Sequence, residues 1–172
     1  MSNIGKNNIK IPEGVSIIFN SLNLQIEGKL GKLECPISGE VSFSKEGNII
    51  KSFSKNKVMW GTEHKLLHNA IIGVSQGFKK RLNLVGIGYR AQVNGNILTL
   101  KLGLSHDVDF IIPEGIEAIC PKPDQIILLG VKKDFLNKTA SSIKLLRKPD
   151  AYKGKGIVFD NEILNLKEGK KK

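Results

Sequence analysis

Two lysines alternate with two glycines near the end of the sequence, in Lys153-Gly154-Lys155-Gly156. The segment 147–152 before them, Arg-Lys-Pro-Asp-Ala-Tyr, adds further cations and an aromatic ring. Lysine and arginine can neutralise phosphates, tyrosine can stack on a base or ribose, and glycine lets a backbone approach a partner closely with its N–H groups exposed. We therefore predict that this stretch binds a polyanion through its cations, Tyr152 and the two glycine amides. The GxxxxGK[ST] pattern of a P-loop is absent from the sequence.

The overall charge agrees with a polyanionic partner. The 172 residues include 27 Lys+Arg and 16 Asp+Glu, which gives a net charge of +11. This surplus exceeds what a small domain needs for solubility, so it favours nucleic acid first and an anionic membrane second. The sequence has no apolar run of about 18 residues that could span a bilayer, so we expect no membrane partner.

Two other patterns could suggest catalysis or cofactor binding. Ser105-His106-Asp107 spells triad residues in a row, but neighbouring side chains of an extended chain point to opposite faces and cannot form the relay. A turn that exposes His106 or places it against a partner is favoured. Gly86-Ile87-Gly88 lacks the third glycine of a dinucleotide fingerprint and precedes a strand. We interpret it as a bend that aims Tyr89 and Arg90.

The histidines and cysteines do not form a recognisable metal site. His64 and His68 stand four residues apart on an expected helix, but no third ligand has suitable spacing, which favours surface or groove histidines. Cys35 and Cys120 lie far apart, which favours small buried side chains in a reducing compartment. We predict no catalytic residue, no metal, no cofactor and no small-molecule substrate.

In the first half, alternating apolar and polar residues predict strands over 15–19, 22–27, 29–34, 41–44 and 49–53. A helix is predicted from Thr62, which can cap it, to about Lys79. The three cations Lys79-Lys80-Arg81 would then suit the C-terminal end of its dipole. In the second half, strands are expected over 82–85, 97–102, 108–112 and 126–129, with a hairpin turn at 94–95. A second helix runs from a capping Asp134 to about residue 147.

An internal repeat suggests how these elements are organised. Ile11-Pro12-Glu13-Gly14-Val15 recurs as Ile112-Pro113-Glu114-Gly115-Ile116, and each copy precedes a strand-like segment. The pattern predicts an α+β fold of two tandem similar units, each a small, mainly antiparallel sheet with one packed helix. We expect the units to span residues 1–81 and 82–172, without a flexible linker between them.

Several segments resemble one family. They are Ile4-Gly5-Lys6 and residues 11–15 near the start, 86–91 and 102–106 in the middle, and 147–157 near the end. Together they resemble ribosomal protein L6 of the bacterial type over the whole chain. The resemblance implies binding to large-subunit rRNA, mainly by the second half, near the sarcin–ricin loop and the stalk base, with neighbouring ribosomal proteins as further partners. The expected RNA contacts are Tyr89, Arg90, Ser105, His106, Lys144, Arg147, Lys148, Tyr152, Lys153, Gly154, Lys155, Gly156, Lys170, Lys171 and Lys172.

The sequence departs from the family pattern at a few positions. Asp150-Ala151 replaces a frequent Glu-Pro, Lys144 replaces a frequent Arg, and Val158 stands where a cation is expected on an RNA-facing strand. For Lys170, Lys171 and Lys172 a merely solvated tail is an equal alternative. The N-terminus lacks signal-peptide and transit-peptide character, so we expect a ribosome in a bacterial cytoplasm or in the organelle that encodes the protein. A free-standing RNA-binding or RNA-chaperone module is the main alternative function, and a hydrolase using Ser105 is the most distant one.

Overall fold

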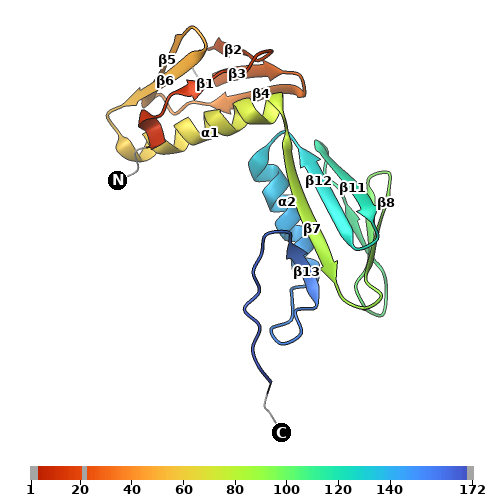
Figure 1. Ribbon diagram of the computed structural model, residues 1–172. Coiled ribbons are helices and arrows are strands. Elements are labelled where there is room, and N and C mark those ends of the chain that lie inside the picture. Colours follow the sequence, from red (N-terminus) through yellow and green to blue (C-terminus); the bar gives the residue numbers. More distant parts are fainter. Residues whose placement is uncertain (1–3, 21–22, 170–172) are drawn as a thin grey trace. The chain divides into compact units, whose positions relative to one another are not determined.

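The computed structural model describes residues 4–20 and 23–169 and separates the chain into two compact units. Unit 1 comprises Met1–Phe78 with Val131–Lys133, and unit 2 comprises Lys79–Gly130 with Asp134–Lys172. Each unit carries antiparallel sheets and one long helix (Figure 1), so the expected α+β class with repeated sheet–helix units is confirmed. That segments 1–81 and 82–172 behave as separate domains stays a prediction.

Unit 1 contains two three-stranded antiparallel sheets, in the orders β1-β6-β5 and β2-β3-β4, within its described residues. The strands agree with the predicted segments to within a few residues, apart from the short β1, which was not expected. The predicted strand start at Leu22 lies outside the described residues. The elements are η1 (Ile4–Lys6), β1 (Ile9–Lys10), β2 (Ser16–Phe19), β3 (Asn23–Gly28), β4 (Gly31–Pro36), β5 (Val41–Glu46), β6 (Ile49–Ser54) and α1 (Lys57–Ser75).

Helix α1 begins before Thr62, so the predicted start is wrong. Asn56 is the N-cap, because its side-chain oxygen accepts a hydrogen bond from the Val58 N–H at 3.1 Å. Thr62 lies inside the helix and donates its hydroxyl to the Val58 carbonyl at 3.3 Å. Asparagine and threonine are both good caps, and the exposed Val58 weakens the apolar periodicity at the true start.

The predicted helix end is also wrong. Gly77 has a φ of 73° and donates its N–H to the Gly73 carbonyl at 3.0 Å, which is the left-handed geometry that commonly ends a helix. Lys79-Lys80-Arg81 therefore lie in strand β7 and not at a helix terminus.

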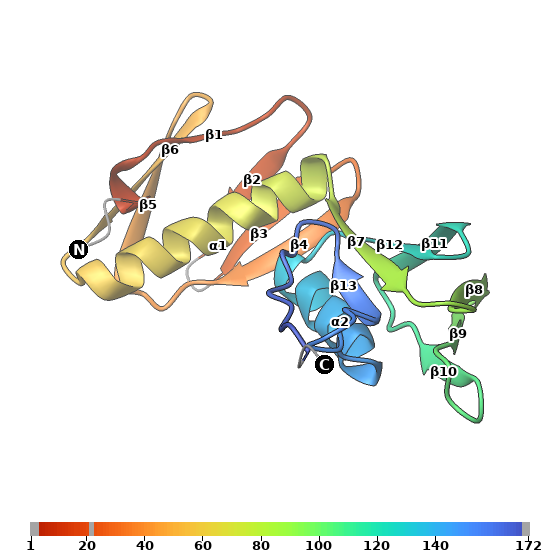
Figure 2. The same cartoon turned by 60° about the horizontal axis from the view of Figure 1, so that its bottom comes forward.

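The core of unit 1 lies between α1 and the sheets, and Figures 1 and 2 both show α1 beside β4. The buried side chains include Ile26, Ile50, Leu67 and Val74. His64 is also buried, so the expectation of a surface or groove histidine is wrong for this residue, and its Nε2 lies 2.7 Å from the Asn7 carbonyl oxygen. A carbonyl only accepts, so Nε2 carries the proton.

Unit 2 combines a four-stranded sheet, β11-β12-β7-β13, with a three-stranded sheet, β10-β9-β8, within the described residues. In both views the smaller sheet lies beyond β11 and β12, on the side away from helix α2 (Figures 1 and 2). The sequence patterns did not predict β11, and a strand at the position of β13 was expected only from the family resemblance. The elements are β7 (Phe78–Val85), β8 (Arg90–Asn94), β9 (Ile97–Lys101), β10 (Val108–Ile111), β11 (Ile116–Lys122), β12 (Gln125–Gly130), α2 (Lys133–Leu146) and β13 (Gly156–Phe159).

Helix α2 covers one face of the four-stranded sheet of unit 2. Its buried positions are Leu136, Thr139, Ala140 and Ile143, at the three- and four-residue spacing of one helical face. Asp134 lies in the first turn, where the helix dipole favours an anion, and is not the residue before the helix. No helix within residues 4–20 and 23–169 is long and apolar enough to cross a membrane.

The two copies of the sequence repeat adopt the same turn. The Val15 N–H donates to the Pro12 carbonyl at 3.3 Å, and the Ile116 N–H donates to the Pro113 carbonyl at 3.3 Å. The glycine inside each copy has nearly the same left-handed φ, 83° in the first and 84° in the second. Each turn leads into an antiparallel pair of strands, β2–β3 in unit 1 and β11–β12 in unit 2.

Candidate nucleic-acid interface

The basic segment after α2 forms a loop that is closed by its own hydrogen bonds. The Asp150 carboxylate accepts the Lys153 N–H at 2.9 Å, and the Asp150 N–H donates to the Lys155 carbonyl at 2.9 Å. Hydrogen bonding from the Lys153 N–H is the main cause that lowers the pKa of Asp150 below its ordinary value. Asp150 is therefore ionised at neutral pH and fixes the backbone that carries the lysines.

The expectation that the two glycines expose their amides is wrong. Gly154 and Gly156 are both buried, and the Gly154 N–H donates to the Asp150 carbonyl at 3.0 Å. A Cβ on Gly156 would lie 2.6 Å from the Pro149 Cα, because the two ends of the loop cross there. Because these glycines have no Cβ, the backbone of the loop can pass close to other parts of the chain. The side chains of the neighbouring lysines are exposed to solvent.

A pocket of about 520 Å³ brings together two segments that are far apart in the sequence. Tyr89 comes from the turn between β7 and β8, and Arg147, Lys148 and Lys155 come from the loop after α2. Leu146 and Asp150 complete the lining. Three of the predicted cations therefore meet beside the ring of Tyr89, an arrangement that suits a phosphate-bearing partner with a flat base.

The Tyr89 ring packs directly against two glycines, where a larger residue would leave it no room. A Cβ on Gly86 would lie 2.8 Å from two ring carbons, and a Cβ on Gly103 would lie 3.2 Å from a third. Gly103 has a φ of 66° and begins the bend that carries Ser105 and His106, which are both exposed. The turn that precedes Tyr89 and the bend that follows β9 are thus both packed against the same ring.

The remaining predicted contacts lie outside this pocket. Tyr152 is 58% exposed, and Lys153 is also exposed on the loop. Lys144 is held internally, since its Nζ lies 2.6 Å from the Glu162 Oε2. Arg90, although it follows Tyr89 directly, lines a different groove. Lys170, Lys171 and Lys172 lie outside the described residues.

Known proteins resemble this chain over its whole length. A family model described as Ribosomal protein L6 matches residues 85–159, which include both halves of the Tyr89 pocket. Large ribosomal subunit protein uL6 of Stutzerimonas stutzeri is 40% identical over 177 residues, and the match covers 100% of each chain. The uL6 of Rhodospirillum rubrum is 42% identical with the same coverage. The chain belongs to the ribosomal protein L6 (uL6) family. The resemblance drawn from the sequence is confirmed.

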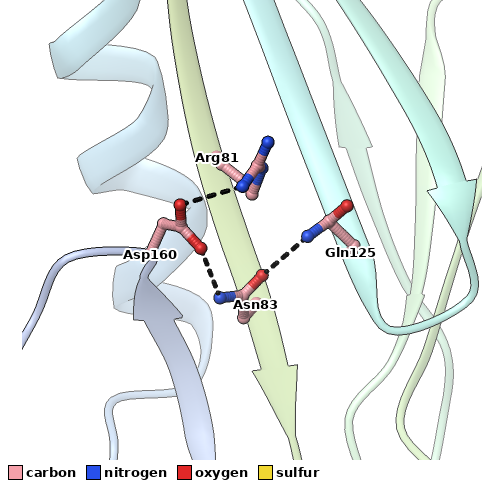
Figure 3. A network of polar contacts seen from close by, with 4 residues as sticks. All are labelled: Arg81, Asn83, Gln125 and Asp160. Atoms are coloured by element: carbon pink, nitrogen blue, oxygen red, sulfur yellow. Dashed lines mark hydrogen bonds and ion pairs between the residues drawn. The ribbon is translucent and has the colours of Figure 1, made fainter.

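In this L6 family member, a polar network positions the strand that follows the basic loop (Figure 3). The Asp160 carboxylate accepts from Arg81 Nη1 at 3.0 Å and from Asn83 Nδ2 at 3.1 Å. Asn83 in turn accepts from Gln125 Nε2 at 3.2 Å. The network joins the end of β13 to β7 and β12. Sequence reasoning missed it, because Asp160 lies 79 residues from Arg81 and no local pattern links them.

The departure at position 158 of this L6 chain has a structural explanation. Val158 pairs with Asn83 across β13 and β7 and is only 6% exposed. The expectation that β13 faces the partner at this position is therefore wrong for this chain, because a lysine or arginine here would be buried without a carboxylate at the same strand position. The absence of a cation at Val158 leaves no gap in the exposed basic surface.

Proposed function

We propose that the chain is a structural constituent of the large ribosomal subunit, and that unit 2 binds large-subunit rRNA through the Tyr89 pocket. The observation that carries the proposal is the meeting of Arg147, Lys148 and Lys155 around Tyr89. The relatives that match over 100% of their length are named as large ribosomal subunit proteins, which supports the same assignment. The pocket lining offers no nucleophile beside a base, so the proposed role is binding without catalysis.

The pocket residues have distinct roles in this proposal. Arg147, Lys148 and Lys155 neutralise phosphates, and Tyr89 supplies a stacking surface for a base or ribose. Asp150 keeps the loop in its shape and does not contact the RNA itself. The exposed residues near the pocket extend the contact, and this set consists of Ser105, His106, Tyr152 and Lys153. Lys170, Lys171 and Lys172 add phosphate contacts from the C-terminal end.

Three of the expected contacts have a different role in the proposal. Gly154 and Gly156 are buried, so they act by letting the loop adopt its shape and not by contacting RNA. Lys144 contributes by holding Glu162, and it reaches RNA only if that ion pair opens. Arg90, by contrast, keeps its expected role and contacts RNA from a separate groove.

We propose that the bound rRNA region is the neighbourhood of the sarcin–ricin loop and the stalk base, where translation factors dock. Unit 1 is more peripheral there and contacts neighbouring large-subunit proteins. The ribosome is of the bacterial type, in a bacterial cytoplasm or in an organelle. Directed cleavage of rRNA from an iron chelate attached at Tyr152→Cys, in a chain whose free Cys35 and Cys120 are replaced by serine, tests this placement, since cuts elsewhere in the large-subunit rRNA would contradict it.

A charge-reversal experiment tests the function itself. We expect Lys153→Glu with Lys155→Glu to weaken binding to bacterial large-subunit rRNA by about tenfold or more, because two phosphate contacts become repulsive. The matched control is Lys29→Glu, an exposed lysine of unit 1 outside the proposed surface. Binding is measured by filter retention at several salt concentrations, and incorporation is measured by sedimentation of tagged protein with large subunits.

Two outcomes would contradict the proposal. Equal losses from the double variant and from Lys29→Glu would mean that general charge, and not the Tyr89 pocket, drives binding. A wild-type chain that binds RNA but never sediments with large subunits would instead support the free-standing RNA-binding module.

A further inference from the structure

We propose that unit 2 has a second RNA-binding groove, distinct from the Tyr89 pocket, in which Arg90, Lys101 and Lys122 hold the phosphodiester backbone of an RNA strand. This groove, called the β8–β9 groove below, lies between β8 and β9 on one side and the end of β11 with the following Pro123 on the other. The inference rests on the proposed function for the identity of the polyanion, and it joins Lys101 and Lys122, which the sequence did not single out, to Arg90 in one site.

The β8–β9 groove is a formed feature of about 500 Å³. One wall is the β-ribbon of β8 and β9, and the other is the segment 120–123, which includes two prolines. The walls are tied together, because the Ala91 N–H donates to the Pro123 carbonyl at 2.7 Å. The two prolines in this wall have a fixed φ, which restricts the backbone there.

The charges of this groove are all of one sign. Its lining includes three cations and no carboxylate. Arg90 and Lys101 are directly opposite each other across β8 and β9, a placement of like charges that destabilises a sheet. Lys101 is partly neutralised by Asp107, whose oxygen lies 3.4 Å from the lysine Nζ. Within residues 4–20 and 23–169, Arg90 and Lys122 take part in no ion pair of 4.0 Å or less, so a bound anion would relieve the repulsion.

The chemistry of the lining favours an RNA strand over other anions. The lining combines three cations with the polar side chains of Gln92 and Thr99, which suits a backbone of repeated phosphates and sugars better than a single phosphate. Gln92 and Thr99 lie directly opposite each other next to the Arg90–Lys101 pair. The Gln92 amide can donate to a phosphate oxygen or a 2′-hydroxyl. Thr99 donates its hydroxyl to Asp109 at 2.7 Å, which leaves its oxygen as an acceptor for a 2′-hydroxyl.

The β8–β9 groove and the Tyr89 pocket are joined by a single peptide bond. Tyr89 lines one and Arg90 lines the other. The two side chains thus line different depressions although their residues are adjacent in the sequence. RNA that occupies both sites therefore contacts both sides of the turn between β7 and β8.

The two cysteines of the natural chain provide a direct test. Cys120 lines the β8–β9 groove, whereas Cys35 lies in unit 1, on strand β4. Burial raises the pKa of both thiols, so both react with a maleimide slowly and best at mildly alkaline pH. The labelling rates at Cys120 and Cys35 are measured by mass spectrometry, without RNA and with bacterial large-subunit rRNA. At an RNA concentration of about ten times the Kd, we expect labelling of Cys120 to slow about tenfold and that of Cys35 to stay unchanged.

A charge-reversal series checks that protection reflects contact. Arg90→Glu with Lys122→Glu should lower rRNA affinity by about tenfold or more and abolish protection of Cys120. The control Lys138→Glu reverses an exposed cation on α2 of the same unit and should change neither. Far-UV circular dichroism confirms that each variant is folded. Polyglutamate, which is acidic but has no ribose or phosphate, is the comparison polyanion.

The outcomes separate this inference from the proposed function. If rRNA binds with full sensitivity to Lys153 and Lys155 but does not protect Cys120, the second groove is wrong and the proposed function stands. If rRNA does not bind at all, both are wrong. Equal protection of Cys120 by polyglutamate and by rRNA would mean that an acidic polypeptide is an equally good occupant, which would overturn the assignment to RNA. Selective protection by rRNA supports it.

Discussion

The crossing of the chain at Gly156 gives the sharpest prediction about the basic loop. A methyl group at this position would lie 2.6 Å from the Pro149 Cα and 2.7 Å from the Lys148 carbonyl oxygen. These are backbone atoms, which cannot rotate away, so β13 or the loop must shift. Overpacking of this kind costs about 1–3 kcal/mol. The φ of 154° adds a strain of about 1 kcal/mol for any residue with a Cβ. We therefore expect Gly156→Ala to destabilise unit 2 by about 3 kcal/mol.

Gly154→Ala is the matched control, because it places the same methyl group two residues away. Its Cβ would lie 3.4 Å from the side-chain tips of Leu164 and Leu166, which is ordinary contact. Only its left-handed φ of 68° costs energy, about 1–2 kcal/mol. Urea unfolding followed by circular dichroism measures both variants. We expect Gly156→Ala to lower the free energy of unfolding of unit 2 more than Gly154→Ala does. It should also weaken rRNA binding, because Lys155 is displaced. Equal losses for the two variants would refute the crossing geometry.

Two further predictions concern polar contacts. The pKa of Glu162 is lowered below its ordinary value of 4.5, mainly by the hydrogen bond from Lys144. The pair therefore stabilises unit 2 above this pH and ceases to do so as pH falls through the lowered pKa. Glu162→Gln should cost about 1 kcal/mol at neutral pH and flatten the acid side of the stability profile, measured by urea unfolding across pH. In unit 1, Trp60 Nε1 donates to the Ser52 carbonyl at 3.0 Å and to its hydroxyl at 2.8 Å. Trp60→Phe should destabilise unit 1 by about 1–2 kcal/mol while rRNA affinity stays unchanged, and an affinity loss would contradict the assignment of binding to unit 2.

Most elements of the fold could be predicted from local patterns, and the exceptions depend on distant contacts. The strands of unit 1 follow their alternation, and the hairpin between β8 and β9 follows its Asn94-Gly95 turn. Strand β13 has only four residues, and it is a strand because it pairs with β7 more than 70 residues earlier. The helix α1 was misplaced for a local reason, since Asn56 and Thr62 are both acceptable caps and only packing decides between them.

The residue types of the candidate site could be predicted, but their grouping could not. The cations and Tyr89 were chosen because such residues bind RNA, and nothing in the sequence shows that Tyr89 meets Arg147 while Arg90 does not. The glycines were assigned exposed amides because of their type, yet the crossing of the loop buries them. Lys101 and Lys122 were missed, because each stands alone in the sequence and gains its meaning only from the groove they share.

The net charge of a basic protein does not by itself locate its RNA surface, because some cations are already neutralised. In unit 2, Arg81 pairs with Asp160 at 3.0 Å, and Lys144 pairs with Glu162 in a site where both side chains are about one-quarter exposed. Both of these pairs brace the segment around β13. The cations that line the Tyr89 pocket and the β8–β9 groove instead cluster with few carboxylates, at a cost in repulsion. A fold keeps such a repulsion where a partner removes it, so we predict that RNA binds at these clustered cations, whatever the total charge of the chain.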